Sequence, residues 1–131
     1  MQYRTFGRLD WKPSALGFGA MRLPILDDDQ GQIDEPEATR MIHYAIDHGV
    51  NYVDTAYTYH REMSERFLGK VLQGGYRERV RLATKMPCWK VESAADFDRF
   101  LDEQLERLQT EFVDFYLLHS LNAGSWAKVR D

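Results

Sequence analysis

The sequence contains a single cysteine, Cys88, so no disulfide bond can form within its 131 residues. It also lacks any apolar run close to the roughly 20 residues of a membrane-spanning helix. The first ten residues, MQYRTFGRLD, contain no apolar core of a secretory signal. Lys and Arg number 17 against 21 Asp and Glu, and they form no basic stripe for nucleic acid. These absences exclude a disulfide scaffold and predict a soluble cytoplasmic protein with no membrane or nucleic-acid partner.

Signatures of metal and dinucleotide binding are absent as well. His43 and His48 are five residues apart, which is not the spacing of a zinc-binding HExxH helix. The acidic stretch DDDQGQ, residues 27–32, lacks the ligand spacing and the closing Glu of a calcium loop. The stretch GFGAM, residues 17–21, lacks the third glycine of the dinucleotide fingerprint. We therefore predict no metal site and no Gly-rich dinucleotide loop.

What the sequence does contain is a regular alternation of strand and helix patterns. Residues 1–14 are predicted to form a short hairpin, because β-prone pieces flank the turn residues Gly7 and Asp10. A strand that leads into a loop is then predicted over residues 16–24, and further strands are predicted at residues 50–55, 79–85 and 112–119. Helices are predicted from Glu35 to His48, between Ser64 and Gly74, and after Ser93. The alternation indicates an α/β protein with a parallel sheet built from βαβ units.

Each predicted helix has a start signal and an apolar stripe. Asp34 can cap the first helix, with Glu37 at the capping-box position, and Ser64 and Ser93 are the predicted caps of the other two. The stripe of the third helix consists of Phe97, Phe100, Leu101, Leu105 and Leu108. The last strand, residues 112–119, is almost continuously apolar, which predicts burial on both faces.

The repeat has a regular length. The strand ends Ala20, Asp54, Lys85 and His119 are separated by 34, 31 and 34 residues. A doubly wound sheet gives such a repeat, and so does a (β/α)8 barrel, which takes about 250 residues. This chain has four strands and three helices, and GSWAKVRD resembles a fourth helix interrupted at its start. We therefore expect a truncated chain, with a hairpin over 1–14 and βα units over 15–131.

Polar side chains follow three successive strands of the predicted sheet. Asp54 and Tyr59 follow the second strand, Lys85 ends the third and His119 ends the fourth. Taken singly, these residues also have ordinary roles as a turn cap, a packed tyrosine, a solvated lysine and a core histidine. Because parallel strands lie about 4.8 Å apart and end at one edge, we expect the four to share a site. Tyr57 either lines that site or packs in the core.

These four residue types suit the protonation of a carbonyl oxygen. A tyrosine keeps its proton at neutral pH and can donate it, and a nearby ammonium stabilises the phenolate that remains. A carboxylate holds the lysine charged and in place, and a histidine orients a carbonyl oxygen or assists proton transfer. None of these groups supplies electrons, so a reduction needs a hydride donor such as a nicotinamide.

The segments GFGAMRL, DTAYTY, LATK and YLLH, together with SERFLGKVL, resemble the aldo-keto reductase family. The resemblance implies the N-terminal half of a (β/α)8 TIM barrel whose bottom is closed by the hairpin. It implies reduction of small-molecule aldehydes and ketones with NADPH, or in some members NADH. It also implies a catalytic tetrad of Asp54, Tyr59, Lys85 and His119. In this tetrad Tyr59 is the general acid, Lys85 with Asp54 tunes it, and His119 positions the carbonyl.

The same resemblance implies where the cofactor lies. The nicotinamide end is expected to contact the stretch after the first strand and the carboxylate of the tetrad, through Gly19, Ala20, Met21, Arg22 and Asp54. Most groups that grip the adenosine and the pyrophosphate in the family come from later strands and loops, which lie outside this sequence.

The sequence departs from the family pattern directly after Tyr59. The family usually has a glycine or a glycine-containing turn there, whereas His60, Arg61 and Glu62 follow in this chain, and they could alter substrate access. The ending YLLHSLN is similar to a bacterial branch whose members often carry a C-terminal iron–sulfur region.

Three hypotheses follow for the chain. The first is the N-terminal half of an NAD(P)H-dependent carbonyl reductase. The second is a non-catalytic half-barrel whose first and fourth strands expose unpaired edges, so that the chain self-associates or acts as an assembly module. The third is a binding or regulatory protein on the same barrel, similar to the ion-channel-associated members of the family.

Overall fold

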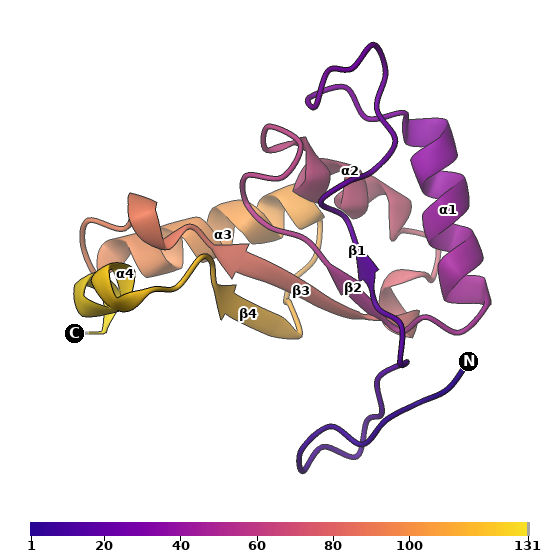
Figure 1. The fold of residues 1–131 in the computed structure, drawn as a ribbon, viewed down its shortest axis with the longest axis horizontal. Coiled ribbons are helices and arrows are strands. Elements are labelled where there is room, and N and C mark those ends of the chain that lie inside the picture. Colours follow the sequence, from indigo (N-terminus) through magenta and orange to yellow (C-terminus); the bar gives the residue numbers. More distant parts are fainter. Residues whose placement is uncertain (131) are drawn as a thin grey trace.

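The computed structural model describes residues 1–130, and it contains a four-stranded sheet with the order β1-β2-β3-β4 (Figure 1). The strands are β1 (Phe18–Gly19), β2 (Tyr52–Asp54), β3 (Arg81–Met86) and β4 (Phe115–Leu118). The helices are α1 (Glu35–Asp47), α2 (Met63–Val71), α3 (Ala95–Leu108) and α4 (Ala123–Val129). All neighbouring strands are parallel, which confirms the predicted α/β alternation.

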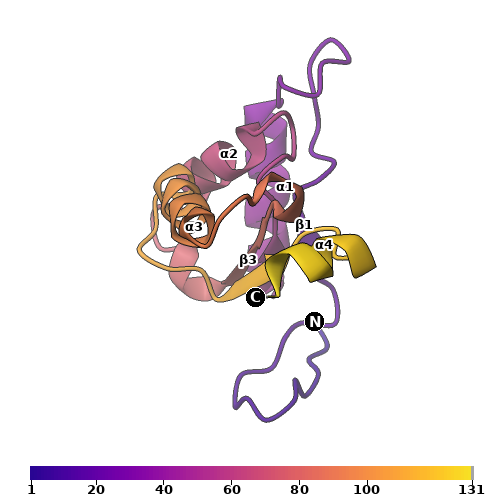
Figure 2. The same ribbon diagram turned by 90° about the vertical axis from the view of Figure 1, so that its left-hand side faces the viewer.

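The strand order distinguishes between the two architectures that the repeat allowed. Each strand pairs with the next one in the sequence, and no strand is added on the other side of β1 among the described residues. Figures 1 and 2 show α1, α2 and α3 gathered along one face of the sheet. A doubly wound sheet reverses its strand order and has helices on both faces. The observed arrangement is therefore that of consecutive units of a barrel.

The main core lies between the sheet and these helices. It contains Ile42 from α1, Leu68 from α2, and Val53 and Leu82 from the strands, all fully buried. Burial of each such aliphatic side chain stabilises the fold by about 1.5–3 kcal/mol. The crossover helices are thereby held on one face of the sheet, and the parallel pairing of the strands puts their carboxyl ends at one rim.

The first helix begins as predicted. The side chain of Asp34 accepts a hydrogen bond from the backbone N–H of Glu37 at 3.2 Å. The reciprocal half of the capping box is missing, because the Glu37 carboxylate binds Arg40 instead. The chain leaves the helix at Gly49, whose φ of +94° suits glycine.

The predicted caps of the next two helices are wrong. Ser64 lies inside α2, where its hydroxyl donates to the Ala20 carbonyl and pairs with the Thr55 hydroxyl. Ser93 precedes α3 and is itself held, because the carboxylate of Asp96 accepts from its backbone N–H at 2.9 Å. A serine before a helix signals a cap only when no stronger partner competes for its hydroxyl or for the helix start.

The segment that the sequence indicated as an interrupted fourth helix forms a regular helix, α4, after β4. The Asn122 side chain accepts from the N–H groups of Gly124 and Ser125, and the Ser125 hydroxyl accepts from the Asn122 N–H. This full capping box offsets the cost of a glycine in the first turn. The predicted end of the last unit at residue 131 lies outside the described residues.

The predicted burial of the last strand on both faces is wrong as well. Tyr116 and Leu117 in β4 are 36% and 40% exposed, because β4 is an edge of the sheet in the described part of the chain. The apolar pattern predicted the strand correctly, but it did not predict how far its side chains are covered. Within residues 16–24, predicted as a strand that leads into a loop, the strand is Phe18–Gly19, which pairs with β2.

The N-terminal hairpin is present as two antiparallel bridges, Tyr3 with Ser14 and Phe6 with Leu9. It lies below the start of β1 in Figure 1. Its Phe6 and Trp11 rings pack against Phe115, with ring centroids 5.7 and 6.0 Å away. The hairpin therefore covers the amino-terminal ends of the strands, opposite to the rim where they end. Within residues 1–130, no helix has both the length and the apolar character that a bilayer span requires.

Candidate active site

Lys85 is the centre of the site at the carboxyl ends of the strands. Its ammonium lies 2.6 Å from the Asp54 carboxylate, 2.8 Å from the Thr55 carbonyl and 3.1 Å from the Tyr59 hydroxyl oxygen. An ammonium has three N–H donors, so these contacts use its full capacity. The adjacent strands β2 and β3 bring Asp54 and Lys85 together, as the sequence predicted from their positions at the strand ends.

The Tyr59 hydroxyl is therefore held by a charged donor. A hydrogen bond from an ammonium to a phenol oxygen stabilises negative charge on that oxygen. Because Lys85 donates to Tyr59, the tyrosine's own proton remains available for a different acceptor. The side chain of Lys85 is mostly buried, which limits the screening of this charge by water.

His119 completes the group from the end of β4. Its ring stands perpendicular to the Tyr59 ring, with centroids 5.6 Å apart, and Trp89 lies 5.2 Å away on another side. Burial and the nearby ammonium of Lys85 lower the pKa of His119 below its ordinary value, with a smaller opposing effect from Asp54. The imidazole is therefore neutral at neutral pH. Its buried Nδ1 has no hydrogen-bond partner among the described residues.

Tyr59 and His119 face an open pocket of about 530 Å³. Its lining residues come from the loop after β1, the turn after β2, and the segments after β3 and β4: Met21, Gln30, Thr58, Tyr59, His60, Arg61, Trp89, His119 and Ser120. This pocket at the carboxyl ends of the parallel strands is where α/β folds place ligands. In this pocket the rings of Trp89 and His119 lie beside the Tyr59 hydroxyl.

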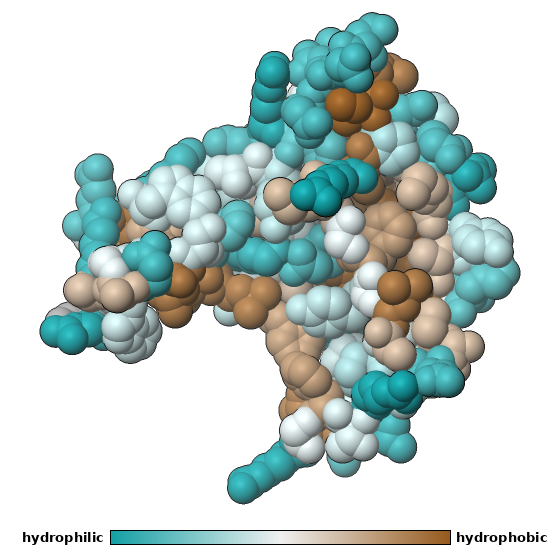
Figure 3. Space-filling view, viewed as in Figure 1, coloured by the Kyte–Doolittle hydropathy of each residue, from teal (hydrophilic) through white to brown (hydrophobic). Residues whose placement is uncertain are grey.

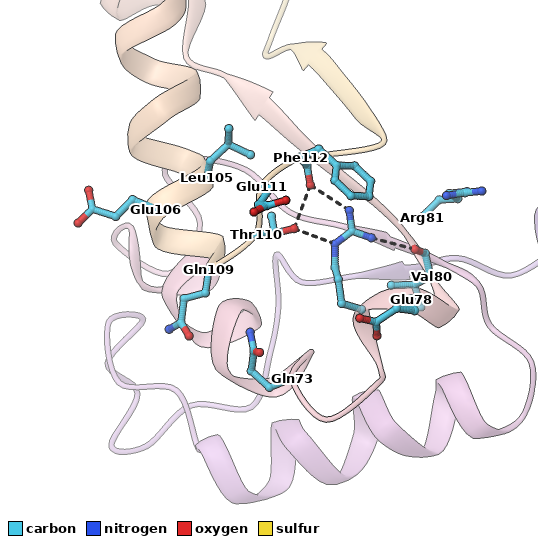
Figure 4. Close-up of a pocket in the computed structure, with 11 residues that line it drawn as sticks. Gln73, Glu78, Val80, Arg81, Leu105, Glu106, Gln109, Thr110, Glu111 and Phe112 are labelled. Atoms are coloured by element: carbon cyan, nitrogen blue, oxygen red, sulfur yellow. Dashed lines mark hydrogen bonds between the residues drawn. The ribbon is translucent and has the colours of Figure 1, made fainter.

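A larger cavity, of about 680 Å³, lies at the other end of β3 (Figure 4). Arg77 lines it and donates to the carbonyls of Val80 and Phe112 and to the carboxylate of Asp114. Asp114 also binds Arg81 and the backbone N–H of Leu82. These polar groups already hold the amino-terminal ends of β3 and β4 together, so we do not assign the chemistry to this cavity.

The four predicted cofactor contacts near β1 differ in what they present. Gly19 pairs with Asp54 in the sheet, and Ala20 is fully buried with both its backbone N–H and its carbonyl engaged. Met21 is exposed and lines the pocket, whereas Arg22 is exposed and does not line it. Of the side chains in this stretch, only that of Met21 lines the pocket with Tyr59.

Tyr57 packs in the core instead of lining the pocket. Its ring meets the Phe100 ring edge-on at 5.4 Å, and its hydroxyl donates to the Glu103 carboxylate. It is 5% exposed and is absent from the lining of the pocket. Of the two interpretations that the sequence allowed, the packing one is therefore correct.

A buried polar network beneath Lys85 was not foreseen. The Glu65 carboxylate accepts from the Thr84 hydroxyl at 2.6 Å and from the Gln104 amide at 2.5 Å. Gln104 also donates to the Lys85 carbonyl at 3.2 Å, and so supports the strand that carries the lysine. Burial raises the pKa of Glu65, although its hydrogen bonds and Arg107 oppose this. The available signal was the polar Gln104 four residues after Phe100, on the stripe that faces the core.

Among residues 1–130, no group of three or more His, Cys, Asp or Glu side chains is placed to hold a metal ion. The side chains that converge at the rim are instead a proton donor, a cation, a carboxylate and an imidazole. The rings of Tyr59, Trp89 and His119 offer flat surfaces that fit the ring of a nicotinamide. Most of the other lining residues are polar, and among them Arg61 is paired with Asp29.

The family model described as "Aldo/keto reductase family" matches residues 15–123. L-galactose dehydrogenase of Arabidopsis thaliana is 32% identical over 130 residues, which are 95% of this chain and 40% of that protein. An aldo-keto reductase of Bacillus subtilis is 32% identical over 127 residues, covering 91% of this chain and 38% of the relative.

Solved structures give the same result. An aldo-keto reductase from Bacillus halodurans in its holo form superposes with a TM-score of 0.73 at 34% identity, over 90% of this chain and 40% of that one. An aldo-keto reductase from Klebsiella pneumoniae in complex with NADPH superposes with a TM-score of 0.70 at 26% identity, over 90% and 42%. The chain spans about 40% of the length of the curated relatives it matches. With the family model covering most of its length, this chain belongs to the aldo/keto reductase family.

Proposed function

We propose that this chain provides the catalytic acid and its supporting groups in an NAD(P)H-dependent reductase of small-molecule aldehydes and ketones. The observation that carries the proposal is the contact of one ammonium, that of Lys85, with both Asp54 and Tyr59 at the rim of the sheet. The chain would form the first half of the barrel in this enzyme. The free cysteine, Cys88, is compatible with a cytoplasmic location.

The residues of the chain act on the carbonyl oxygen. The substrate carbonyl lies in the pocket, within reach of Tyr59 and His119. As negative charge develops on this oxygen, Tyr59 transfers its phenolic proton to it, and Lys85 stabilises the phenolate that remains. Asp54 keeps the ammonium in place and balances its charge. With a hydride supplied to the carbonyl carbon by the nicotinamide, the products would be an alcohol, the oxidised nicotinamide and a tyrosinate, which regains its proton from solvent.

His119 positions the carbonyl as a neutral ring. Its Nδ1 is buried without a partner among residues 1–130, and a proton placed there would leave an unsatisfied donor. The tautomer with the proton on Nε2 avoids this cost. In that form the ring donates a hydrogen bond to the substrate oxygen and carries no charge that would compete with Tyr59.

A bound nicotinamide would supply the hydride that adds to the carbonyl carbon. We assign its reactive end to Gly19, Ala20, Met21, Arg22 and Asp54, of which Met21 lines the pocket directly. We propose NADPH as the donor, with NADH as the alternative. The Klebsiella pneumoniae relative solved with NADPH supports the first choice.

The experiment that tests this function is Tyr59→Phe, in the protein expressed from its complete reading frame. The substitution keeps the ring next to His119 and Lys85 but removes the proton. We expect the turnover of an aldehyde to fall by a factor of about 10²–10⁴, with NADPH affinity nearly unchanged. The measurement is a steady-state assay together with a fluorescence titration of the cofactor.

The matched control is Tyr57→Phe, two residues earlier in the chain. Tyr57 donates to Glu103 away from the pocket, so its loss should leave turnover unchanged. Retained turnover in Tyr59→Phe would remove this residue from the role of acid.

A second candidate function rests on a different observation. The chain of 131 residues, taken by itself, is an interaction module whose open sheet edge pairs with another chain. The exposed Tyr116 and Leu117 of β4 favour it. Tight NADPH binding by a monomer of this chain would contradict it.

A further inference from the structure

His60 directly follows Tyr59, where the family usually has a glycine or a glycine-containing turn, and its backbone is left-handed. Its φ is +51°, and the next two residues, Arg61 and Glu62, have φ values of +51° and +71°. Glycine adopts this left-handed conformation without strain, whereas most side chains do not. Histidine is among the residues that enter it more readily, but it still carries a cost. The side chain must therefore contribute something that glycine would not.

The imidazole of His60 is 4% exposed and makes two hydrogen bonds to distant backbone. Its Nε2 accepts from the N–H of Leu23 at 3.0 Å, and its Nδ1 lies 2.9 Å from the carbonyl oxygen of Gln30. A backbone N–H only donates and a carbonyl only accepts. The two partners therefore fix the tautomer of His60, with its proton on Nδ1.

Both partners belong to the loop between β1 and α1, residues 20–34. This loop contributes Met21 and Gln30 to the pocket, and the turn after β2 contributes Tyr59. A second link, from Arg61 to Asp29 at 3.0 Å, lies at the exposed surface and is weakened by water. His60 is thus a buried connection between two walls of the pocket, in addition to the bonds that Ala20 makes with Asp54 and Ser64.

We propose that His60 is a positioning residue that ties the β1–α1 loop to the turn carrying Tyr59. The ring of His60 supplies an acceptor for the Leu23 N–H and a donor for the Gln30 carbonyl. The tie holds Met21, a proposed contact of the nicotinamide, in a fixed position relative to the proton of Tyr59. The structural tie stands on the contacts alone, while its effect on catalysis rests on the proposed function.

The direct test is the state of the ring in the unaltered protein. The ¹⁵N chemical shifts of His60 at neutral pH should report a neutral ring with the proton on Nδ1 and a hydrogen-bonded Nε2. A ring with its proton on Nε2, or one that exchanges between tautomers, overturns the proposal. This measurement needs no variant, no cofactor and no activity.

The second test is amide exchange in His60→Gly, which suits the left-handed backbone and removes only the ring. We expect the Leu23 amide to exchange about tenfold faster, because its acceptor is gone, while the amides of Ile42 and Leu68 keep their protection. Unchanged exchange at Leu23 would mean that the ring is a passive filler at this position. Should the variant fail to fold, the ring measurement decides alone.

His43→Phe is the matched control for that experiment. His43 is also partly buried and also bonds one backbone carbonyl, that of Val71, but it lies on α1 away from the pocket. A phenyl ring preserves its stacking on Tyr76. Leu23 exchange should stay unchanged in this variant, and an acceleration there equal to that of His60→Gly would count against a specific tie.

The catalytic consequence is measured separately, in the protein from the complete reading frame. His60→Gly should raise the KM for the nicotinamide cofactor severalfold and change kcat less, since Tyr59 and Lys85 are untouched. His60→Gln, whose amide oxygen can still accept from Leu23, should restore part of the loss. An enzyme without reductase activity would refute the proposed function and leave the ring and exchange results standing.

Discussion

Lys85 has no N–H left for a substrate. Its three donors are taken by Asp54, the Thr55 carbonyl and Tyr59, all within 3.1 Å. In the proposed function it therefore acts on a substrate only through the tyrosine. This separates the residue that carries the charge from the residue that gives the proton, and each is held by a different strand end.

The protonation of His119 provides a test at the same scale. Burial and the Lys85 ammonium hold the pKa of His119 below its ordinary value of 6.5. We expect its ring to titrate below that value by NMR. Lys85→Met should raise the His119 pKa part of the way back, because the repelling charge is removed while the burial remains. A ring that titrates at or above 6.5 in the unaltered protein would contradict the neutral imidazole of the mechanism.

The same shift makes the stability of the fold depend on pH. Because the folded-state pKa of His119 is lowered, the unfolded chain takes up the proton first as the pH falls. The contribution is absent above pH 6.5, destabilises the fold as the pH drops through 6.5, and levels off below the folded-state pKa. Urea unfolding of His119→Gln should therefore show a smaller loss between about pH 8 and about pH 5 than the unaltered protein.

Sequence reasoning was sufficient for the residues at the strand ends but not for those beneath them. Asp54, Lys85 and His119 each close an apolar run, and the spacing of parallel strands then brings them together. Glu65 and Gln104 lie on the buried faces of α2 and α3. An apolar stripe does not predict a role for a polar residue within it. Their role depends on partners 39 residues apart, which no local pattern contains.

At the scale of elements, Arg107 joins α3 to α2 and to the turn after Tyr59. Its guanidinium lies 2.6 Å from Glu103, 2.8 Å from Glu62 and 3.4 Å from Glu65. It also lies over the ring of Tyr57 at 4.1 Å. Three carboxylates from three segments thus share one buried cation, and the strained residues 60–62 are held at their far end.

Arg107→Met should therefore destabilise the fold strongly. The methionine fills similar volume, but it leaves the buried Glu65 without a cation, which typically costs about 3–5 kcal/mol. The control is Arg99→Met on the same helix, whose pair with Asp96 is exposed and is worth at most about 1 kcal/mol. The free energies come from urea unfolding of both variants. Equal losses in the two would show that the buried cluster contributes nothing special.

Element boundaries were the less predictable part of the fold. The α1 pattern gave its start and its end within a residue, because Asp34 and Gly49 are local signals. Ser64 and Ser93 failed as caps, since the first bonds across to Ala20 and the second yields to Asp96. What decides such a case is the competing partner, and that partner is set by tertiary structure.

At the scale of the whole molecule, the sheet has an exposed side. Figure 3 shows apolar side chains along β4 and toward the N-terminal hairpin on the viewed face. Leu117 of β4 lies beside Lys85 of β3 in the sheet and is 40% exposed. An edge strand with exposed apolar groups pairs readily with another chain.

We therefore expect the 131-residue chain to self-associate. Its weight-average mass in sedimentation equilibrium should rise with concentration, and Leu117→Lys should reduce this rise, because a charge on an edge strand opposes pairing. The control is Leu26→Lys, which places the same charge on an exposed loop residue away from β4. A monomer at every concentration would contradict this expectation and the second candidate function.

The two ends of the strands have different roles. Asp114, with Arg77 and Arg81, fastens the amino-terminal ends of β3 and β4, while Thr58, Trp89 and Ser120 surround the pocket at the other end. Residues in the loops of the pocket can therefore be substituted without weakening the ion pairs at the amino-terminal ends of β3 and β4. Protein engineers can use this division. In the proposed function, a library that varies Thr58, Trp89 and Ser120 would change which substrates are accepted, while the rest of the fold is kept.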